Sequence, residues 1–266
     1  MLRAGLVAVG LGALVTACGG GESSQRGEVR AYLERTNAVQ QRFAPDFRRA
    51  DAAFKAFANG DEMAGGTIAT LARAESDIRS AQDAVAALRP PARAATVHDR
   101  LLRVYAIDAD LAHETLRLAR YRDAGPRALA GLDRASKRLR GKLRAARKPG
   151  TQAQALSSFS SAVGRTLRRL NGLDVPEILA PSHRAQVERL QTTRRLTARL
   201  RDAVRDRDSQ RVAKLLLKFR AGGESLRSQR VLMREGAAAY TSRLKRLAQA
   251  QTDLGREQAR LRRSVR

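Results

Sequence analysis

The hydrophobic residues of this chain recur at steps of three and four along almost the whole sequence. In residues 28–59, for example, the apolar stripe includes Val29, Tyr32, Phe43 and Phe54. This spacing places apolar side chains on one face of a helix. No segment of useful length alternates with the period of two that a half-buried strand requires. Only 4% of the residues are aromatic and none is Trp. We therefore predict an all-α fold.

Proline and glycine divide this pattern into helices. The predicted breaks are Asn59-Gly60, Pro90-Pro91, Gly125-Pro126, Lys148-Pro149-Gly150, Pro176 and Gly222-Gly223. Short breaks of this kind favour antiparallel neighbours, so we predict an antiparallel bundle or bundles of seven or eight helices. The final helix carries the clearest heptad pattern, formed by Met233, Ala237, Tyr240, Leu244, Leu247, Gln251, Leu254, Gln258 and Leu261.

An internal duplication is predicted at an offset of 85 residues. The informative matches are Pro91 with Pro176 and His98 with His183, because these rarer residues fall at the same helix-break-helix junction. We expect each proline to open a helix antiparallel to the preceding one. We expect the two histidines to lie in similar settings and to hydrogen-bond a carbonyl of the preceding loop. Paired ligands or pH sensors are the alternative roles.

The N-terminus carries an export pattern. A short basic start is followed by an uncharged stretch, residues 4–17, which is shorter than the roughly 20 residues of a membrane-spanning helix. It ends in Val15-Thr16-Ala17-Cys18, and a Gly/Ser-rich segment follows.

This motif resembles the lipobox of bacterial lipoproteins. The resemblance implies cleavage between Ala17 and Cys18 and attachment of a diacylglycerol to the Cys18 thiol, the only thiol in the chain. Residues 1–17 would be the signal peptide and 18–27 a flexible tether. The protein would be exported and anchored in membrane lipid on the extracytoplasmic side. The resemblance covers residues 1–24 only, and no family is recognised for the helical remainder. A plain secretory signal and an uncleaved anchor are the alternatives.

The charge is large and unevenly distributed. The chain has 52 Lys and Arg against 26 Asp and Glu, a net charge of +26. Residues 1–124 hold 17 basic and 15 acidic side chains, whereas residues 125–266 hold 35 and 11. We therefore predict a near-neutral bundle at 28–147 and a strongly basic one at 151–263, ending in the heptad helix. The candidate anion contacts are Arg138, Arg140, Lys142, Arg144, Arg256, Arg260, Arg262 and Arg263.

Such a surface repels itself and favours anionic partners. Outside the cytoplasmic membrane these are acidic lipids, phosphate-bearing wall polymers and extracellular DNA. Cytoplasmic nucleic acid is disfavoured by the export signal and because four of the six Phe lie in the near-neutral first helix rather than among the cations. No protein partner is indicated. The alternative is that these cations are only a solvated surface.

Catalytic and metal-binding patterns are sparse. His113-Glu114-Thr115-Leu116-Arg117 begins like a zinc-protease motif but has Arg where the second His is needed. Asp110 and His113 share a helix face and are weak metal candidates, since a metal site in a bundle needs further ligands from other helices. Glu75 and Asp77 are the nearest candidates, and nothing in the sequence brings them in. No Ser lies in a Gly-x-Ser-x-Gly context. We expect no cofactor and no enzymatic activity.

The sequence thus predicts a membrane-tethered, non-enzymatic binding or structural module of the cell envelope whose basic half contacts an anionic surface or an acidic partner. The alternative is an accessory lipoprotein that holds a small ligand or a metal for a transport or sensing system. A buried polar cluster around Asp108, Asp110 and His113 would favour that alternative.

Overall fold

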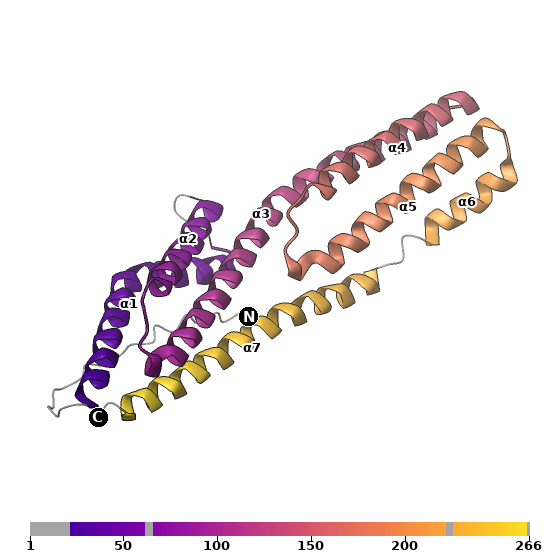
Figure 1. The fold of residues 1–266 in the computed structure, drawn as a ribbon. Helices are drawn as coiled ribbons and strands as arrows, with labels where there is room; N and C mark the ends of the chain where they lie inside the picture. The colour runs from indigo at the N-terminus through magenta and orange to yellow at the C-terminus, as the bar shows by residue number, and fades with distance from the viewer. Residues whose placement is uncertain (1–21, 62–65, 222–225, 265–266) are drawn as a thin grey trace. The chain divides into compact units, whose positions relative to one another are not determined.

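The computed structural model describes residues 22–61, 66–221 and 226–264, which form seven α-helices and no strand (Figure 1). The all-α prediction is confirmed. The helices are α1 (Glu22–Asn59), α2 (Thr67–Ala86), α3 (Ala95–Ala145), α4 (Pro149–Asn171), α5 (Ala180–Arg205), α6 (Ser209–Ala221) and α7 (Leu226–Ser264). Two short 3-10 turns, η1 (Ala92–Ala94) and η2 (Glu177–Leu179), precede α3 and α5.

The predicted helix end at Gly125-Pro126 is wrong, because α3 continues through Pro126. A proline inside a helix removes one backbone hydrogen bond and costs about 3 kcal/mol. Side-chain packing offsets this cost here. Ala119 and Ala128 are buried on either side of the proline, and Ala128 packs against Val163 and Leu167 of α4. The third and fourth predicted helices are therefore a single helix.

The chain divides into two compact units. Unit 1 comprises residues 1–116 and 241–266, and unit 2 comprises residues 117–240. Because α3 and α7 each contribute to both units, the division falls within these helices and not at the 148–150 turn that separates the segments 28–147 and 151–263.

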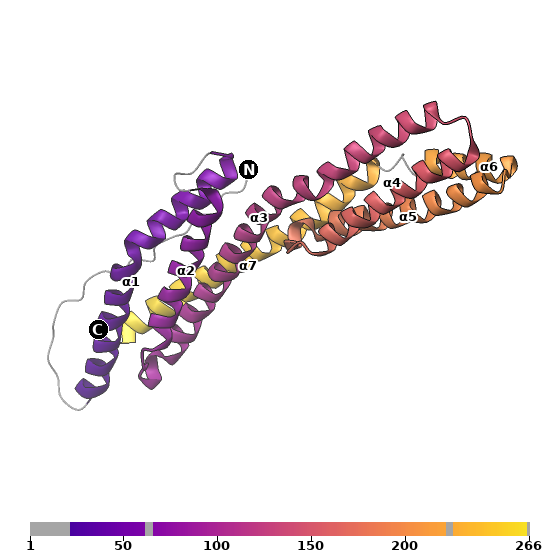
Figure 2. The ribbon, with the colours of Figure 1, turned by 90° about the horizontal axis from the view of Figure 1, so that it is seen from above.

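Unit 1 contains α1, α2, the first part of α3 and the last part of α7. Helices α1 and α2 form an antiparallel pair (Figure 2). Their shared core with α3 consists of Ala50, Ala74, Ile78, Ala109 and Ala112, with Phe47 and Phe54 packed against it. The α7 segment buries most of its predicted heptad positions, including Leu247, Leu254, Gln258 and Leu261.

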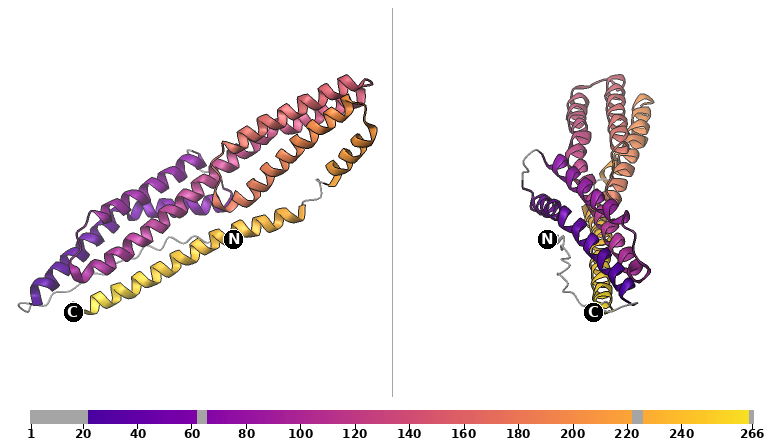
Figure 3. Two further views of the ribbon diagram at one scale, coloured as in Figure 1. Left: turned by 45° about the vertical axis from the view of Figure 1, so that its right-hand side comes forward. Right: turned by 60° about the vertical axis from the view of Figure 1, so that its left-hand side comes forward.

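Unit 2 contains the second part of α3, then α4, α5, α6 and the start of α7. Helices α4 and α5 run antiparallel, and α6 folds back along α5 (Figure 3). One core cluster consists of Ala128, Val163, Leu167, Leu170 and Leu190. A second consists of Leu156, Leu200, Ala203 and Leu215, flanked by Leu139 and Leu143 of α3.

The two proline junctions repeat with the offset seen in the sequence. Helices α2 and α4 end at Ala86 and Asn171, and the helices after each junction begin at Ala95 and Ala180, so both boundaries differ by 85 residues. Pro91 and Pro176 are both extended, with ψ of 156° and 149°. Each opens a 3-10 turn and a helix that runs back along the preceding one.

Candidate functional site

Most of the net charge belongs to unit 2. Residues 117–240 hold 30 basic and 10 acidic side chains, whereas the rest of the chain holds 22 and 16. Unit 2 therefore has a net charge of +20 in fewer than half of the residues. The excess of positive charge in residues 125–266, which amounts to +24, therefore lies mostly within one compact unit.

The most concentrated cations of unit 2 lie on the last turns of α3. Arg138, Arg140, Lys142 and Arg144 are all exposed. The apolar residues between them, Leu139 and Leu143, pack into the second core cluster. In the part of the chain that the structure describes, none of the four cations forms an ion pair with a carboxylate. We call residues 137–148, which continue through Arg147 and Lys148, the α3 cationic segment.

Cations from neighbouring helices lie beside small residues. A Cβ added at Gly131 of α3 would be 3.8 Å from Nη1 of Arg169 on α4. A Cβ added at Gly164 of α4 would be 3.5 Å from Cζ of Arg194 on α5. Each guanidinium therefore lies close to the backbone of the preceding helix in the chain.

The second set of candidate anion contacts lies at the end of α7, in unit 1. Arg256 lies 3.9 Å from Asp253, and Arg260 donates a hydrogen bond of 2.8 Å to Glu257. Arg263 is exposed and Arg262 is half-buried. Two of these four arginines thus have an acidic neighbour one helical turn away, which weakens their field. The two predicted sets belong to different units and differ in how well they are neutralised.

The weak metal candidates are not brought together. His113 Nδ1 lies 2.9 Å from Oε1 of Glu75, and Arg79 donates to the same carboxylate oxygen at 3.0 Å. Asp110 is exposed and lines a separate pocket. Among the described residues, no group of three or more His, Cys, Asp or Glu could hold a metal ion. Of the two further candidates, Glu75 does meet His113, a contact that the sequence alone could not establish because it joins residues 38 positions apart.

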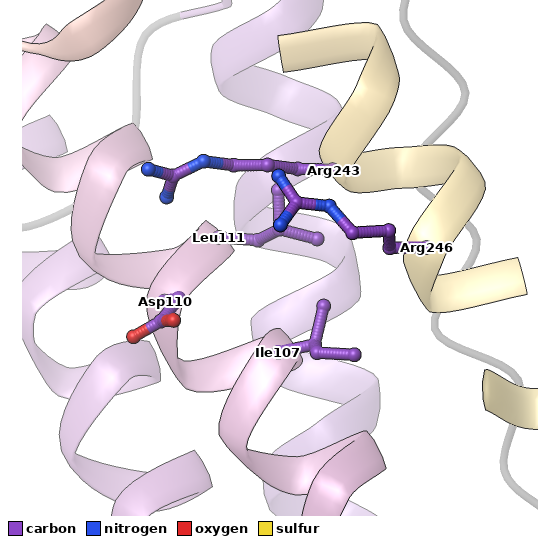
Figure 4. A pocket seen from close by; sticks show the side chains of 5 residues that line it. All are labelled: Ile107, Asp110, Leu111, Arg243 and Arg246. Carbon is purple, nitrogen blue, oxygen red and sulfur yellow. The ribbon is translucent and has the colours of Figure 1, made fainter. Parts of the chain in front are cut away.

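The pocket at Asp110 lies inside unit 1, between α3 and α7. It has a volume of about 140 Å³ and is lined by Ile107, Asp110, Leu111, Arg243 and Arg246. Figure 4 shows both arginine side chains extending from α7 toward α3. Small-molecule sites usually enclose about 300–1,000 Å³, so this pocket suits at most a small anion.

Asp108 does not complete a polar cluster with Asp110 and His113. Its side chain is only 8% exposed, whereas Asp110, two residues further along α3, is exposed on another face. Burial raises the pKa of Asp108 to about 7. Burial also raises the pKa of the neighbouring Tyr105 to about 12. The arrangement expected for a ligand-holding lipoprotein is therefore not formed by these three residues.

The two histidines have tyrosine partners instead of the expected loop carbonyls. Nδ1 of His98 lies 2.9 Å from the hydroxyl of Tyr32, and Nδ1 of His183 lies 3.0 Å from the hydroxyl of Tyr121. In both pairs the rings meet edge to face, with centroids 6.0 and 5.8 Å apart. Burial raises the pKa of both tyrosines and lowers that of His183. Burial thus favours the neutral His183 ring, and the tautomer of that ring sets the direction of its hydrogen bond with the Tyr121 hydroxyl.

The 85-residue offset alone does not identify Tyr32 and Tyr121 as the partners of the two histidines. The two tyrosines are 89 residues apart, so Tyr121 lies one helical turn beyond the position that corresponds to Tyr32. The corresponding position is Arg117, which donates to Asp174 of the junction loop at 2.7 Å. His98 and His183 thus have the similar settings that the sequence predicts, since each contacts a tyrosine hydroxyl. The tyrosine of the second pair lies one helical turn further along the chain than the 85-residue offset places it.

The predicted lipidation residue Cys18 and the cleavage residue Ala17 lie outside the described residues. Within the described part of the chain, no helix combines the length and the hydrophobicity needed to cross a bilayer. Comparison of the chain with models of known protein families, with curated proteins and with solved structures found no match.

Proposed function

We propose that this protein is a lipid-tethered, non-enzymatic module of the bacterial cell envelope, and that unit 2 contacts an anionic surface. The tether is supported by the agreement of position, apolar stretch, lipobox-like motif and Gly/Ser segment in residues 1–24. A single lipid anchor is usually insufficient for stable attachment and is commonly combined with a basic region. Cys18 and the cations of unit 2 would supply these two signals.

The observation that carries the proposal is the exposed, unneutralised α3 cationic segment. In unit 1, some exposed cations have an acidic neighbour one turn away, as in the pairs Arg49–Asp46, Lys55–Asp51 and Arg79–Glu75. Arg138, Arg140, Lys142 and Arg144 have no such neighbour in the described chain. Each cation held near an acidic bilayer contributes about 1 kcal/mol, so a set of this size can sustain binding without a shaped pocket.

We further propose that unit 2 and part of unit 1 arose by internal duplication. The equal offsets of the helix ends, of the 3-10 turns and of the prolines support this proposal, as do the two Tyr–His pairs. The positive charge would then have accumulated in one copy, which is the pattern expected when one copy keeps a scaffold role and the other acquires a binding surface.

The test compares two variants that each lose four positive charges from the whole chain. In the first, Arg138, Arg140, Lys142 and Arg144 are all replaced by Gln. In the second, Arg256, Arg260, Arg262 and Arg263 are replaced. Binding to vesicles that contain phosphatidylglycerol and to a soluble polyphosphate is measured at low and physiological salt.

We expect the α3 variant to lose more affinity than the α7 variant, and binding of the unaltered chain to weaken steeply with salt, because the Debye length shortens to about 8 Å at physiological ionic strength. The proposal is wrong if the unaltered chain has no salt-sensitive affinity for either anion. Equal losses in the two variants would instead assign the contact to the net charge of the whole protein.

A further inference from the structure

The face of α6 that points away from the core combines exposed leucines with lysines. Val212, Leu215 and Phe219 face inward and pack in the second core cluster of unit 2. On the outer side, Leu217 is 64% exposed and Leu216 is 46% exposed. These are two of the three large hydrophobic residues that are exposed in the described chain, the third being Val231.

The cations of α6 form a row beside Leu217, while Leu216 lies on the far side of Leu217 from this row. Arg211, Lys214 and Lys218 are spaced by three and four residues, so they share one side of the helix, and all three are exposed. Ala213 and Leu217, also spaced by four, form the adjacent row. The outer surface of α6 therefore presents apolar side chains next to long basic ones.

The helix is held in place independently of this outer surface. The Asp208 side chain accepts a hydrogen bond of 2.9 Å from the backbone N–H of Arg211, which caps the first turn. The inward residues contact α5. The outward leucines are thus not needed to hold α6 on unit 2, and their exposure requires another explanation.

We propose that the outer face of α6 docks on the surface of an anionic lipid bilayer, with Leu216 and Leu217 entering the interface between headgroups and acyl chains. Helices that lie on bilayers combine such an apolar stripe with flanking Lys and Arg, whose long side chains reach the headgroup phosphates. This inference rests on the proposed function and names its anionic partner.

The chemistry of α6 favours lipid over the other candidate occupants. A hydrophilic polyanion, such as a wall polymer, would pair with the lysines but would leave the leucines in water. A second copy of unit 2 would bring another +20 charge against the first, and like charges oppose association. An acidic bilayer can contact both the basic and the apolar side chains of α6, because its phosphates pair with the cations and its hydrocarbon accepts the leucines.

The first experiment uses the absence of Trp from the natural sequence. Leu217→Trp and Val231→Trp are each introduced into the whole chain carrying Cys18→Ser, so that each protein has one tryptophan, which is excited at a wavelength where tyrosine does not absorb, and no lipid on residue 18. Emission is recorded with vesicles of phosphatidylcholine alone and with added phosphatidylglycerol. We expect a blue shift, and quenching by brominated lipid, for Trp at 217 with acidic vesicles only. Val231, at 52% exposure, is the matched control and should show no shift.

The second experiment separates the apolar and the basic contribution. We expect the double variant Leu216→Ser with Leu217→Ser to weaken binding to acidic vesicles by about tenfold, because the two leucines then no longer gain contact with lipid. The control Val231→Ser should change the affinity by less than about twofold.

The double variant Lys214→Gln with Lys218→Gln should weaken binding to acidic vesicles by at least about tenfold. Lys55→Gln with Lys245→Gln removes the same charge from exposed positions of unit 1 and should have a smaller effect. Circular dichroism checks that each variant keeps its helix content.

The outcomes distinguish this inference from the proposed function. Binding to acidic vesicles without an emission change at 217 overturns the docking of α6 but leaves an electrostatic contact of unit 2 in place. If the chain binds polyphosphate but not acidic vesicles, the docking of α6 is likewise overturned. The electrostatic contact of unit 2 then remains, with an anionic polymer as its partner. An equal shift at 217 and 231 overturns the assignment to α6. A chain that binds no anion overturns both proposals.

Discussion

The hydroxyl of Tyr32 and Nδ1 of His98 lie 2.9 Å apart in the interior of unit 1, where both side chains are almost fully buried. The bond joins α1 to the start of α3 and fixes how these helices meet at the first proline junction. Tyr121 and His183 make the same bond at the second junction, where both side chains are half-buried.

We expect Tyr32→Phe to destabilise the protein more than Tyr121→Phe. Losing the hydroxyl leaves a buried imidazole nitrogen without a partner, which costs about 1–3 kcal/mol. At the second junction water can replace the lost hydroxyl, so the cost should be below about 1 kcal/mol. Urea denaturation of both variants measures the difference. Equal losses of stability would show that burial does not distinguish the two bonds.

Asp108 should make stability fall as the pH rises. Its folded pKa of about 7 lies above the ordinary value of about 3.9, so between these values the folded chain keeps a proton that the unfolded chain releases. The free energy of unfolding should therefore decline from about pH 4 to about pH 7 and then level off, by a total of order 4 kcal/mol.

The variant Asp108→Asn should remove most of this decline, because it cannot ionise. The matched control is Asp110→Asn, two residues away on the exposed side of α3, which should keep it. The measurement is urea denaturation at several pH values. A wild-type stability that rises over this range would contradict the assignment.

Gly236 should be intolerant of any side chain. A Cβ at this position would lie 1.8 Å from the carbonyl oxygen of Ile178 in η2, a contact with backbone that cannot move aside cheaply. We expect Gly236→Ala to destabilise the protein by at least about 2 kcal/mol, in the range of overpacked sites. Gly255→Ala, in the same helix with nothing within 4 Å, should instead stabilise it by up to about 1 kcal/mol. Thermal unfolding of the two variants should move in opposite directions.

Replacing Arg207 by glycine should stabilise the folded protein. Arg207 lies two residues beyond the end of α5 with a φ of 57°, and the backbone N–H of Asp208 donates to the carbonyl of Ala203 across the turn. Helix ends of this kind usually carry glycine, because side chains disfavour positive φ. We expect Arg207→Gly to stabilise the chain by about 0.5–1 kcal/mol, whereas Arg205→Gly, in the last turn of α5, should destabilise it by about 1 kcal/mol. Chemical denaturation tests both, and a loss of stability in Arg207→Gly would contradict the prediction.

Cys18→Ser should release the protein from membranes or leave it as an uncleaved precursor. The thiol is the attachment point that the lipobox resemblance implies, and the chain has no other. Fractionation of cells and mass spectrometry of the N-terminal peptide measure the outcome. The control is Ser23→Ala, which lies in α1, because the helix begins at Glu22 and residues 22–27 are not the flexible tether that the sequence predicts. An unmodified Cys18 on mature protein outside the membrane fraction would reject the tether.

The all-α class and most helix boundaries could be predicted from the amino-acid sequence alone. The periodicity of Leu, Val and Ala and the breaks at Pro91, Pro149 and Pro176 are local signals, because a helix face and a missing backbone N–H are properties of neighbouring residues. The uneven charge and the repeat of Pro and His at 85 residues were equally visible. The export motif is also local, and it stays a prediction.

Which residues from different helices meet depends on the packing of the folded chain. Pro126 was expected to end a helix, but packing around Ala119 and Ala128 outweighs its cost. The partners of His98 and His183, the close approach of Gly236 and the exposure of Leu217 also depend on how one helix is rotated and shifted against another. A single sequence does not fix that register, because each apolar stripe can pack in several ways of similar energy. The free energy of the whole core selects among them.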